Sequence, residues 1–164
     1  MQGFGLQFDH WGLATRQLDK TLGFLRGLGY STPPVVFDPL QRVDLVLCQH
    51  PSMPAVEVIT PAQGPGPLDA VLAQQPQAIY HLCFRSGDAA GSLAAIKNAG
   101  HRVLTVSAPK PAVLFGGRQV SFYMVAGFGL IEIIDEARMQ WGSDGPQSLA
   151  PPQMPAPPHP LNQA

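Results

Sequence analysis

The sequence of 164 residues is poor in charge, in aromatic side chains and in cysteine. Charged residues make up 13% and the formal net charge is −1, and no stretch gathers Lys and Arg as a phosphate backbone would require. We therefore expect no nucleic-acid partner. The only two cysteines, Cys48 and Cys83, lie in apolar runs, where a free thiol behaves as a small hydrophobic group. We interpret both as reduced core residues.

Long apolar runs are also missing. No segment approaches the ~20 consecutive apolar residues that a membrane-spanning helix needs. The N-terminus lacks the succession of charged, apolar and small residues that is typical of a signal peptide. We therefore expect a cytoplasmic protein without a membrane partner. With 45% hydrophobic residues, a chain of this length can form one domain with its own core.

Proline, by contrast, is abundant, with 18 residues. Seven of them follow Trp141, in a stretch that has almost no branched apolar residues. Such a composition cannot bury enough apolar surface to fold, and it predicts a disordered, proline-rich C-terminal tail. We place the folded domain at 1–138 and the tail at 139–164.

Within the folded domain, two stretches match each other at a constant offset. His10 corresponds to His81 and Gly29 to Gly100, and both pairs are 71 positions apart. Each stretch begins with a strand, continues with a helix whose apolar residues recur every three or four positions, and ends that helix at a glycine. Three short strands follow in each copy. The sequence therefore predicts two βαβββ modules.

The modules are expected at 6–60 and 78–136, with a linker at 61–77 that opens with a proline- and glycine-rich stretch. The expected strands are 6–14, 35–37, 43–48 and 56–60, then 79–85, 101–106, 119–125 and 130–135. The expected helices are 18–28, 68–74 and 90–99, and the longest loop of the second module is expected at 108–117.

Each module closes with a glutamate inside an apolar strand, Glu57 between two valines and Glu132 between two isoleucines. A buried carboxylate without a partner costs several kcal/mol, so each needs a cation or metal nearby. Taken singly, such a glutamate is more often on a solvated sheet face, and a single histidine is more often a satisfied core residue. The equivalent placement of His10 with His81 argues against coincidence.

These four residues form a chemically coherent ligand set. Two carboxylates and two neutral imidazoles balance the charge of one divalent cation. Mixed nitrogen and oxygen donors suit Zn, Ni, Co, Mn or Fe(II). We predict that His10, Glu57, His81 and Glu132 bind one such ion. Two positions of an octahedral ion would remain for adjacent oxygens of a substrate, so that an enolate could be stabilised.

The segments that carry these residues resemble a known family. FDHWGLATRQLDKTLGFLRGLGY, VEVITP, YHLCF and LIEII are similar to the vicinal oxygen chelate superfamily, in particular to its glyoxalase I and methylmalonyl-CoA epimerase branches. The resemblance covers roughly residues 6–136. It implies an α+β fold in which two βαβββ modules form an open, curved barrel around a divalent metal.

The resemblance also implies an activity. The four ligand positions fall on His10, Glu57, His81 and Glu132, and a ligating glutamate, Glu132 in preference to Glu57, would take the proton in isomerase, epimerase or lyase chemistry next to a carbonyl. The substrate would be a small carbonyl compound or an acyl-CoA. Two alternatives remain open: a non-catalytic binding protein of the antibiotic-resistance type, and an Fe(II) ring-cleaving dioxygenase that needs no residue at position 57.

One position departs from the epimerase pattern. In that branch a further carboxylate near the start of the third strand helps to move the proton, and the matching residue here is Leu40. Asp38 or Asp44 would have to take its place.

Substrate contacts are expected from the second module. In the 108–117 loop and just after it, Lys110 and Arg118 are expected to hold an anionic group. Ser121 and Tyr123, alternate residues of the next strand, are expected to share the cavity face of Glu132. Whether the two modules pair within one chain or across a homodimer is open.

Overall fold

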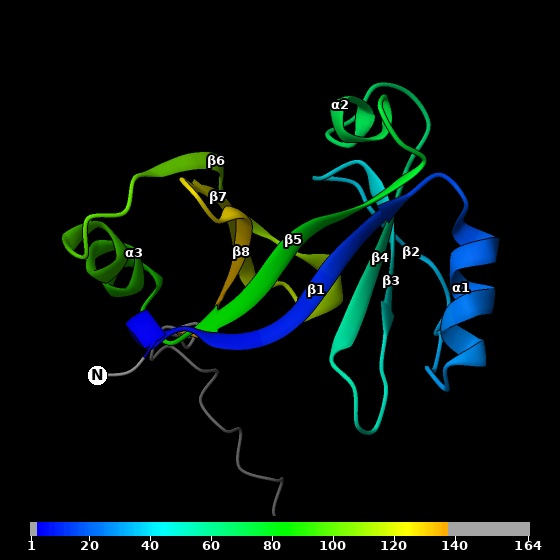
Figure 1. The fold of residues 1–164 in the computed structure, drawn as a ribbon, viewed down its shortest axis with the longest axis horizontal. Helices are drawn as coiled ribbons and strands as arrows, with labels where there is room; N and C mark the ends of the chain where they lie inside the picture. Colours follow the sequence, from blue (N-terminus) through cyan, green and yellow to red (C-terminus); the bar gives the residue numbers. More distant parts are fainter. Residues whose placement is uncertain (1–2, 138–164) are drawn as a thin grey trace, which may run out of the picture.

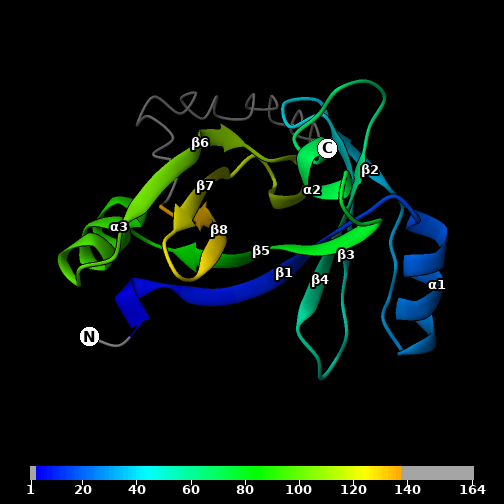
Figure 2. The ribbon, with the colours of Figure 1, turned by 45° about the horizontal axis from the view of Figure 1, so that its top comes forward.

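The computed structural model describes residues 3–137, and the tail predicted at 139–164 lies outside them. Eight strands form one mixed sheet that curls into a half-barrel (Figures 1 and 2). Helices α1 (Leu18–Gly27) and α3 (Ala89–Asn98) lie on its outer side, one at each end. The α+β fold of two βαβββ modules around an open, curved sheet is confirmed.

The remaining elements follow in chain order: η1 (Gly3–Gly5), β1 (Gln7–Thr15), β2 (Val36–Asp38), β3 (Val43–Cys48), β4 (Ala55–Pro61), α2 (Asp69–Leu72), β5 (Gln77–Ser86), β6 (Val103–Pro111), η2 (Val113–Phe115), β7 (Gln119–Val125) and β8 (Gly129–Asp135). None of the helices within residues 3–137 has the length and apolar character needed to cross a membrane.

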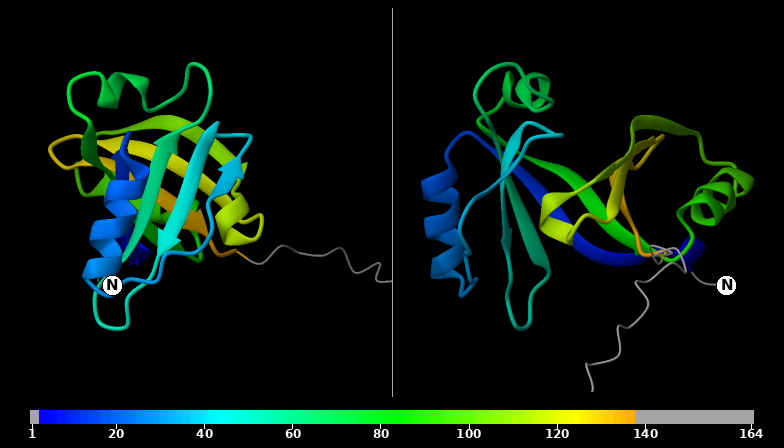
Figure 3. Two further views of the ribbon diagram at one scale, coloured as in Figure 1. Left: turned by 90° about the vertical axis from the view of Figure 1, so that its right-hand side faces the viewer. Right: turned by 180° about the vertical axis from the view of Figure 1, so that it is seen from behind.

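The strand order, β2-β3-β4-β1-β5-β8-β7-β6, repeats one pattern twice. In the first half β1 pairs with β4 in parallel, and in the second half β5 pairs with β8 in parallel. The antiparallel pair β1 and β5 joins the halves at the centre of the sheet, and Figure 3 shows the two curved halves on either side of it. The opening strands of the two modules, which carry the two histidines, are therefore direct neighbours.

The two long helices end in the same way. Gly29 and Gly100 have φ of +95° and +90°, and the next residue donates its backbone N–H to a carbonyl of the last helical turn. This left-handed closure favours glycine, as the repeat predicts. The predicted helix at 18–28 is one residue too long, because Leu28 lies beyond the end of α1 and is 46% exposed.

Most of the other predicted boundaries shift by one or two residues, and two elements change in extent. The helix predicted at 68–74 spans only Asp69–Leu72. The strand predicted at 101–106 continues to Pro111, so the loop predicted at 108–117 begins at Ala112. Pro109 and Pro111 fit in this strand because β6 is an edge strand with irregular register, where residues without a free N–H are tolerated.

Apolar side chains form clusters on both faces of the sheet. Two clusters lie between the sheet and the helices α1 and α3. Two more line the inner face, one in each half, and include residues of α2 and η2. The polar site lies between the two inner clusters.

Both cysteines are fully buried and unpaired, on β3 and β5. Burial raises the pKa of the Cys48 thiol to about 11, and burial also raises the pKa of Cys83. At pH 8 about one Cys48 thiol in a thousand is the reactive thiolate. We expect the native protein to react with a disulfide reagent at least about 100-fold more slowly than the unfolded chain. A native thiol that reacts as fast as the unfolded chain would contradict the buried placement.

Candidate metal centre

Four polar side chains meet at the centre of the inner face, where the two modules join. His10, Glu57, His81 and Glu132 are between 0% and 4% exposed. They come from β1, β4, β5 and β8, the four central strands of the sheet. All four belong to one chain, so the modules pair within the chain to form this cluster.

The strand register explains how Glu57 and His81 come together. Glu57 on β4 and His81 on β5 are both cross-strand neighbours of Gly12 on β1. Their side chains project on the same face, separated by a residue without a side chain. The His81 ring fills the space above Gly12, since a Cβ placed there would lie 2.3 Å from His81 Cε1.

The second half repeats this layout. His10 on β1 and Glu132 on β8 are both cross-strand neighbours of Cys83 on β5. Cys83 is 71 residues after Gly12, so the two small residues occupy equivalent positions of the repeat. The duplication therefore places a glutamate on one side of each small residue and a histidine on the other side.

The donor atoms converge on one point. Glu132 Oε2 lies 3.2 Å from His81 Nε2 and 3.5 Å from His10 Nε2. Glu57 Oε2 lies 3.5 Å from His81 Nε2 and 3.7 Å from His10 Nε2. Donors bound to one ion at about 2.0–2.2 Å lie roughly 2.8–3.6 Å apart at bond angles near 90–110°. The arrangement can therefore hold a metal ion.

Within residues 3–137, three of these atoms have no hydrogen-bond partner: His10 Nε2, His81 Nε2 and Glu132 Oε2. Buried polar atoms are normally paired, because leaving one unpaired costs about 1–3 kcal/mol. All three point at the same centre. A cation at that centre would satisfy all three at once, so the residues present fit a metal ion.

A β-bulge supports His10 from behind. Phe8 pairs with Phe84 and His10 with Cys83, so Asp9 is an extra residue on β1. The bulge turns the Asp9 carboxylate toward the ring, and His10 Nδ1 lies 2.7 Å from Asp9 Oδ1.

Arg85 holds Asp9 in turn, with Nε 2.8 Å from Asp9 Oδ2 and Nη1 3.6 Å from Glu136. Such a carboxylate fixes the tautomer and orientation of a ligating imidazole. Asp9 therefore leaves Nε2 of His10 free to face the centre.

His81 is supported by packing instead. Tyr80 is the extra residue of a second bulge, on β5, at the position of the repeat that corresponds to Asp9. Its ring meets the His81 ring edge-on at 5.5 Å, and Phe122 does the same at 5.4 Å. Among the described residues, His81 Nδ1 has no hydrogen-bond partner. Equivalent bulges thus give one histidine a carboxylate and the other an aromatic ring.

The cluster shifts the acidity of its members in the metal-free protein. Burial alone would lower the pKa of His10, but its hydrogen bond with Asp9 and the neighbouring Cys83 and carboxylates raise that pKa well above its ordinary value. Burial alone would raise the pKa of Glu132, yet the two histidines lower it to about 2. The centre therefore favours a positive charge beside its ionised carboxylates, as a metal site requires.

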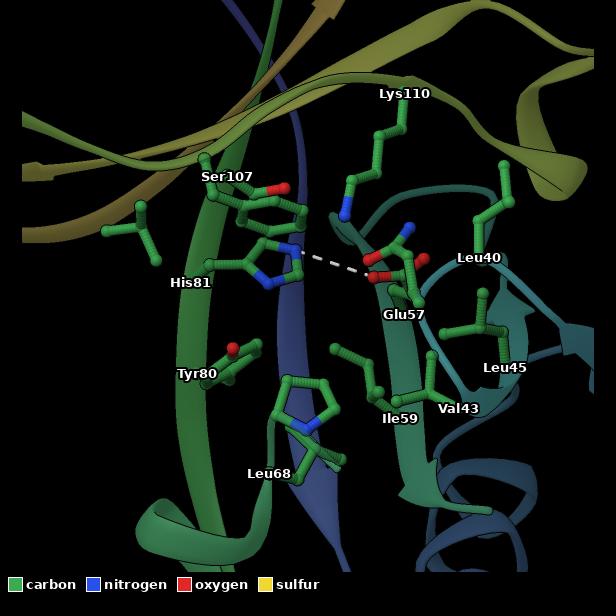
Figure 4. Close-up of a pocket in the computed structure, with 14 residues that line it drawn as sticks. Leu40, Val43, Leu45, Glu57, Ile59, Leu68, Tyr80, His81, Ser107 and Lys110 are labelled. Carbon is green, nitrogen blue, oxygen red and sulfur yellow. Dashed lines mark ion pairs between the residues drawn. The ribbon is translucent and has the colours of Figure 1, made fainter. Parts of the chain in front are cut away.

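A cavity of about 320 Å³ opens beside the centre (Figure 4). Of the four clustered residues, Glu57 and His81 line it, whereas His10 and Glu132 lie behind them. Phe115 of η2 stacks on the His10 ring at 5.6 Å. A small molecule in this cavity would reach the centre from the side of Glu57 and His81.

Of the four predicted substrate contacts, the structure places one, Lys110, in the wall of the cavity. Arg118 is exposed and is not part of that wall. The prediction that Ser121 and Tyr123 share the face of Glu132 is wrong. Phe122 is the cross-strand neighbour of Glu132, so the residues on either side of it point to the opposite face, where Tyr123 packs with the core next to α3.

The acidic residues near position 40 do not reach the cavity as free carboxylates. Asp38 is buried and accepts hydrogen bonds from the backbone N–H of Leu40 and of Gln41, which fixes the turn before β3. Asp44 lines a separate shallow pocket. Leu40 itself lines the cavity. Neither aspartate replaces the carboxylate missing at position 40.

Comparison with known proteins identifies the family. A family model described as the glyoxalase/bleomycin resistance protein/dioxygenase superfamily matches residues 9–122. The chain belongs to this superfamily. No protein of curated function matches the sequence. The match spans both histidines, Glu57 and most of the second module.

Solved structures of similar proteins share the fold of this superfamily member. Methylmalonyl-CoA epimerase from Mycobacterium tuberculosis is 20% identical, with a TM-score of 0.64 over 80% of this chain and 87% of its own. A hypothetical protein from Bacillus halodurans is 20% identical, with a TM-score of 0.67 over 80% of this chain and 94% of its own. A variant of the Streptomyces coelicolor methylmalonyl-CoA epimerase, in complex with 2-nitronate-propionyl-CoA, is 21% identical. Its TM-score is 0.64 over 80% of this chain and 98% of its own.

Several residues of the site escaped sequence reasoning. Strict alternation along β1 and β5 would turn Asp9 and Tyr80 away from the adjacent histidines, and the bulges reverse this. Gly12 and Cys83 carried one available signal, because both follow their histidine by two positions and so lie on its face. Ser107 lines the cavity only because β6 continues past its predicted end.

Proposed function

We propose that the protein is a divalent-metal-dependent enzyme of the glyoxalase and epimerase type, which moves a proton at a carbon next to a carbonyl or acyl thioester. The observation that carries this proposal is the convergence of four buried donor atoms beside a cavity, three of them without a hydrogen-bond partner in the described part of the chain. The structural likeness to methylmalonyl-CoA epimerases supports the same class, since one such epimerase is in complex with methylmalonyl-CoA.

His10, Glu57, His81 and Glu132 would hold the ion. Bound there, a divalent ion would act as a Lewis acid that stabilises negative charge on a substrate oxygen. The protein supplies the orientation, through Asp9 for His10 and through packing for His81. It also excludes water from the rear of the centre, where His10 and Glu132 are no more than 1% exposed.

Glu57 is the proton-transferring group that the geometry favours. Of the two clustered carboxylates, it alone lines the cavity, so a carbon atom in the cavity reaches it without passing the other side chains. Its carboxylate would take the proton from the carbon next to the carbonyl and return it to that carbon or to its neighbour. Glu132 would serve as a ligand from behind.

Among the described residues, Glu57 is the only carboxylate that lines the cavity, and this narrows the range of reactions. Leu40 faces the cavity where the epimerase branch is expected to have an acid, and Asp38 is held in its turn. A single carboxylate delivers and removes the proton on one side of the substrate. This favours isomerisation or elimination on one face over exchange between two faces. The presence of Glu57 among the donors also favours this class over a dioxygenase that needs only three ligands.

Solvent deuterium exchange tests this function. Zn²⁺-, Ni²⁺- or Co²⁺-loaded protein, incubated in D₂O with methylmalonyl-CoA and with an alkylglyoxal thiohemiacetal, is expected to exchange the proton next to the carbonyl of one of them. Glu57→Gln keeps an oxygen donor but cannot accept the proton, and we expect it to slow exchange at least about 100-fold. The metal content of Glu57→Gln is measured in the same samples. It distinguishes slow exchange caused by loss of the base from slow exchange caused by loss of the metal ion. Bound metal without exchange of either probe would favour the non-catalytic binding protein.

A further inference from the structure

The cavity beside the centre has two chemically different ends. Figure 4 shows Lys110 and Ser107 on one side of the His81 and Glu57 pair, and Leu68 and Ile59 on the other. The pair lies between the two ends. A molecule whose oxygens meet the centre would therefore extend in both directions.

The apolar end is formed by the first module. Val43, Leu45, Ile59 and Leu68 line it and are between 1% and 3% exposed. They belong to one packed inner cluster, so this wall is fixed by the core rather than by a loop. Tyr80, re-aimed by its bulge, closes the side next to His81. Such a wall gains free energy from burying hydrocarbon and offers little to a charged group.

The polar end has the opposite character. Of the described residues that line the cavity, Lys110 is the only Lys or Arg, and it comes from the edge strand β6. Ser107 of the same strand and Gln41 of the facing turn add hydrogen-bonding groups, and Leu40 is the apolar residue that Figure 4 shows beside them. Figure 4 shows the Lys110 ammonium directed into the cavity, on the side of Glu57. An anionic substituent at this end would have a counter-ion.

We infer that the substrate is a compact amphipathic acid: a carbonyl compound that carries a hydrocarbon substituent, bound against Val43, Ile59 and Leu68, and an anionic group, bound by Lys110. This inference rests on the proposed function, because it assumes that the substrate oxygens meet the centre. The volume of about 320 Å³ limits the buried part to a small molecule. A hydrocarbon substituent larger than methyl is expected to bind more tightly, since each further methylene leaves water.

Hydroxamates test both ends with defined probes, because their two adjacent oxygens chelate a divalent ion. We would titrate Co²⁺-loaded protein with acetohydroxamate, butyrohydroxamate, hexanohydroxamate and succinohydroxamate, and follow the visible Co²⁺ spectrum. The affinity is expected to rise about fourfold for each added methylene until the apolar end is filled. Lys110→Met is expected to weaken succinohydroxamate about 2- to 5-fold, because Lys110 is exposed, and to leave hexanohydroxamate unchanged. Lys97→Met, on α3, is the control and should change neither.

The outcomes are separable and need no variant of the core. Equal affinities along the alkyl series in the wild type, or an unchanged succinohydroxamate affinity in Lys110→Met, would overturn the inference while the metal centre stands. Absence of Co²⁺ binding by the wild type would instead overturn the proposed function and the inference with it.

Discussion

Replacing Gly12 with alanine is expected to lower the affinity for a divalent metal at least about 100-fold while the fold is kept. A Cβ at this position would lie 2.3 Å from Cε1 and 2.7 Å from Nε2 of His81, so the imidazole has to leave its place above Gly12. The ring is a side chain that can rotate about its own bonds, whereas the backbone of β1 is paired on both sides. The metal site is therefore expected to give way before the sheet does.

Gly23→Ala is the matched control, since a Cβ at Gly23 meets no atom within 4 Å. It should bind metal as the wild type does. A double-mutant cycle with His81→Ala sharpens the result: once His81 has lost its ring, Gly12→Ala should cost nothing further. Circular dichroism and thermal unfolding would report on the fold. Wild-type metal affinity in a folded Gly12→Ala variant would show that His81 is not a ligand.

Replacing Asp9 with asparagine is expected to lower the metal affinity by about 10- to 100-fold. The carboxylate of Asp9 lies 2.7 Å from His10 Nδ1 and is itself held by Arg85 at 2.8 Å. It orients the ring and raises its basicity, so an amide of the same shape keeps the packing and loses the charge. In the metal-free variant the pKa of His10 should fall, because hydrogen bonding to Asp9 is the main influence that raises it.

Chelator competition gives the affinity, and NMR titration of the histidine rings gives the pKa. Asp44→Asn is the control and should change neither, because the Asp44 side chain lines a separate pocket. A variant that loses affinity with an unchanged His10 pKa would indicate a general loosening of the site. Unchanged affinity would show that Asp9 has no positioning role.

Most of the fold was predictable because the sequence contains it twice. The offset of 71 residues between His10 and His81 gave both modules from one pattern, and the two glycines that end the helices have the left-handed conformation that their positions imply. The grouping of two histidines with two glutamates followed from the same repeat. What brings the four residues to one point is the pairing of β1 with β5, which places the modules side by side.

The details that a strict alternation of faces cannot supply were missed. The two bulges place Asp9 and Tyr80 against the site, although each precedes its histidine by one position. Alternation places Ser121 and Tyr123 on one face, but which face that is depends on the register with β8, which puts Phe122 beside Glu132. Register depends on pairing between strands, and the spacing within one strand does not determine it.

The measurement that tests the central claim most directly is metal content by plasma mass spectrometry. Wild type, His81→Ala and Glu132→Ala would be purified without added metal or chelator, and each would be checked for folding by circular dichroism. The account predicts about one equivalent of divalent metal in the wild type and a near-complete loss in both folded variants. A wild type that carries no metal and takes up none on titration would contradict it.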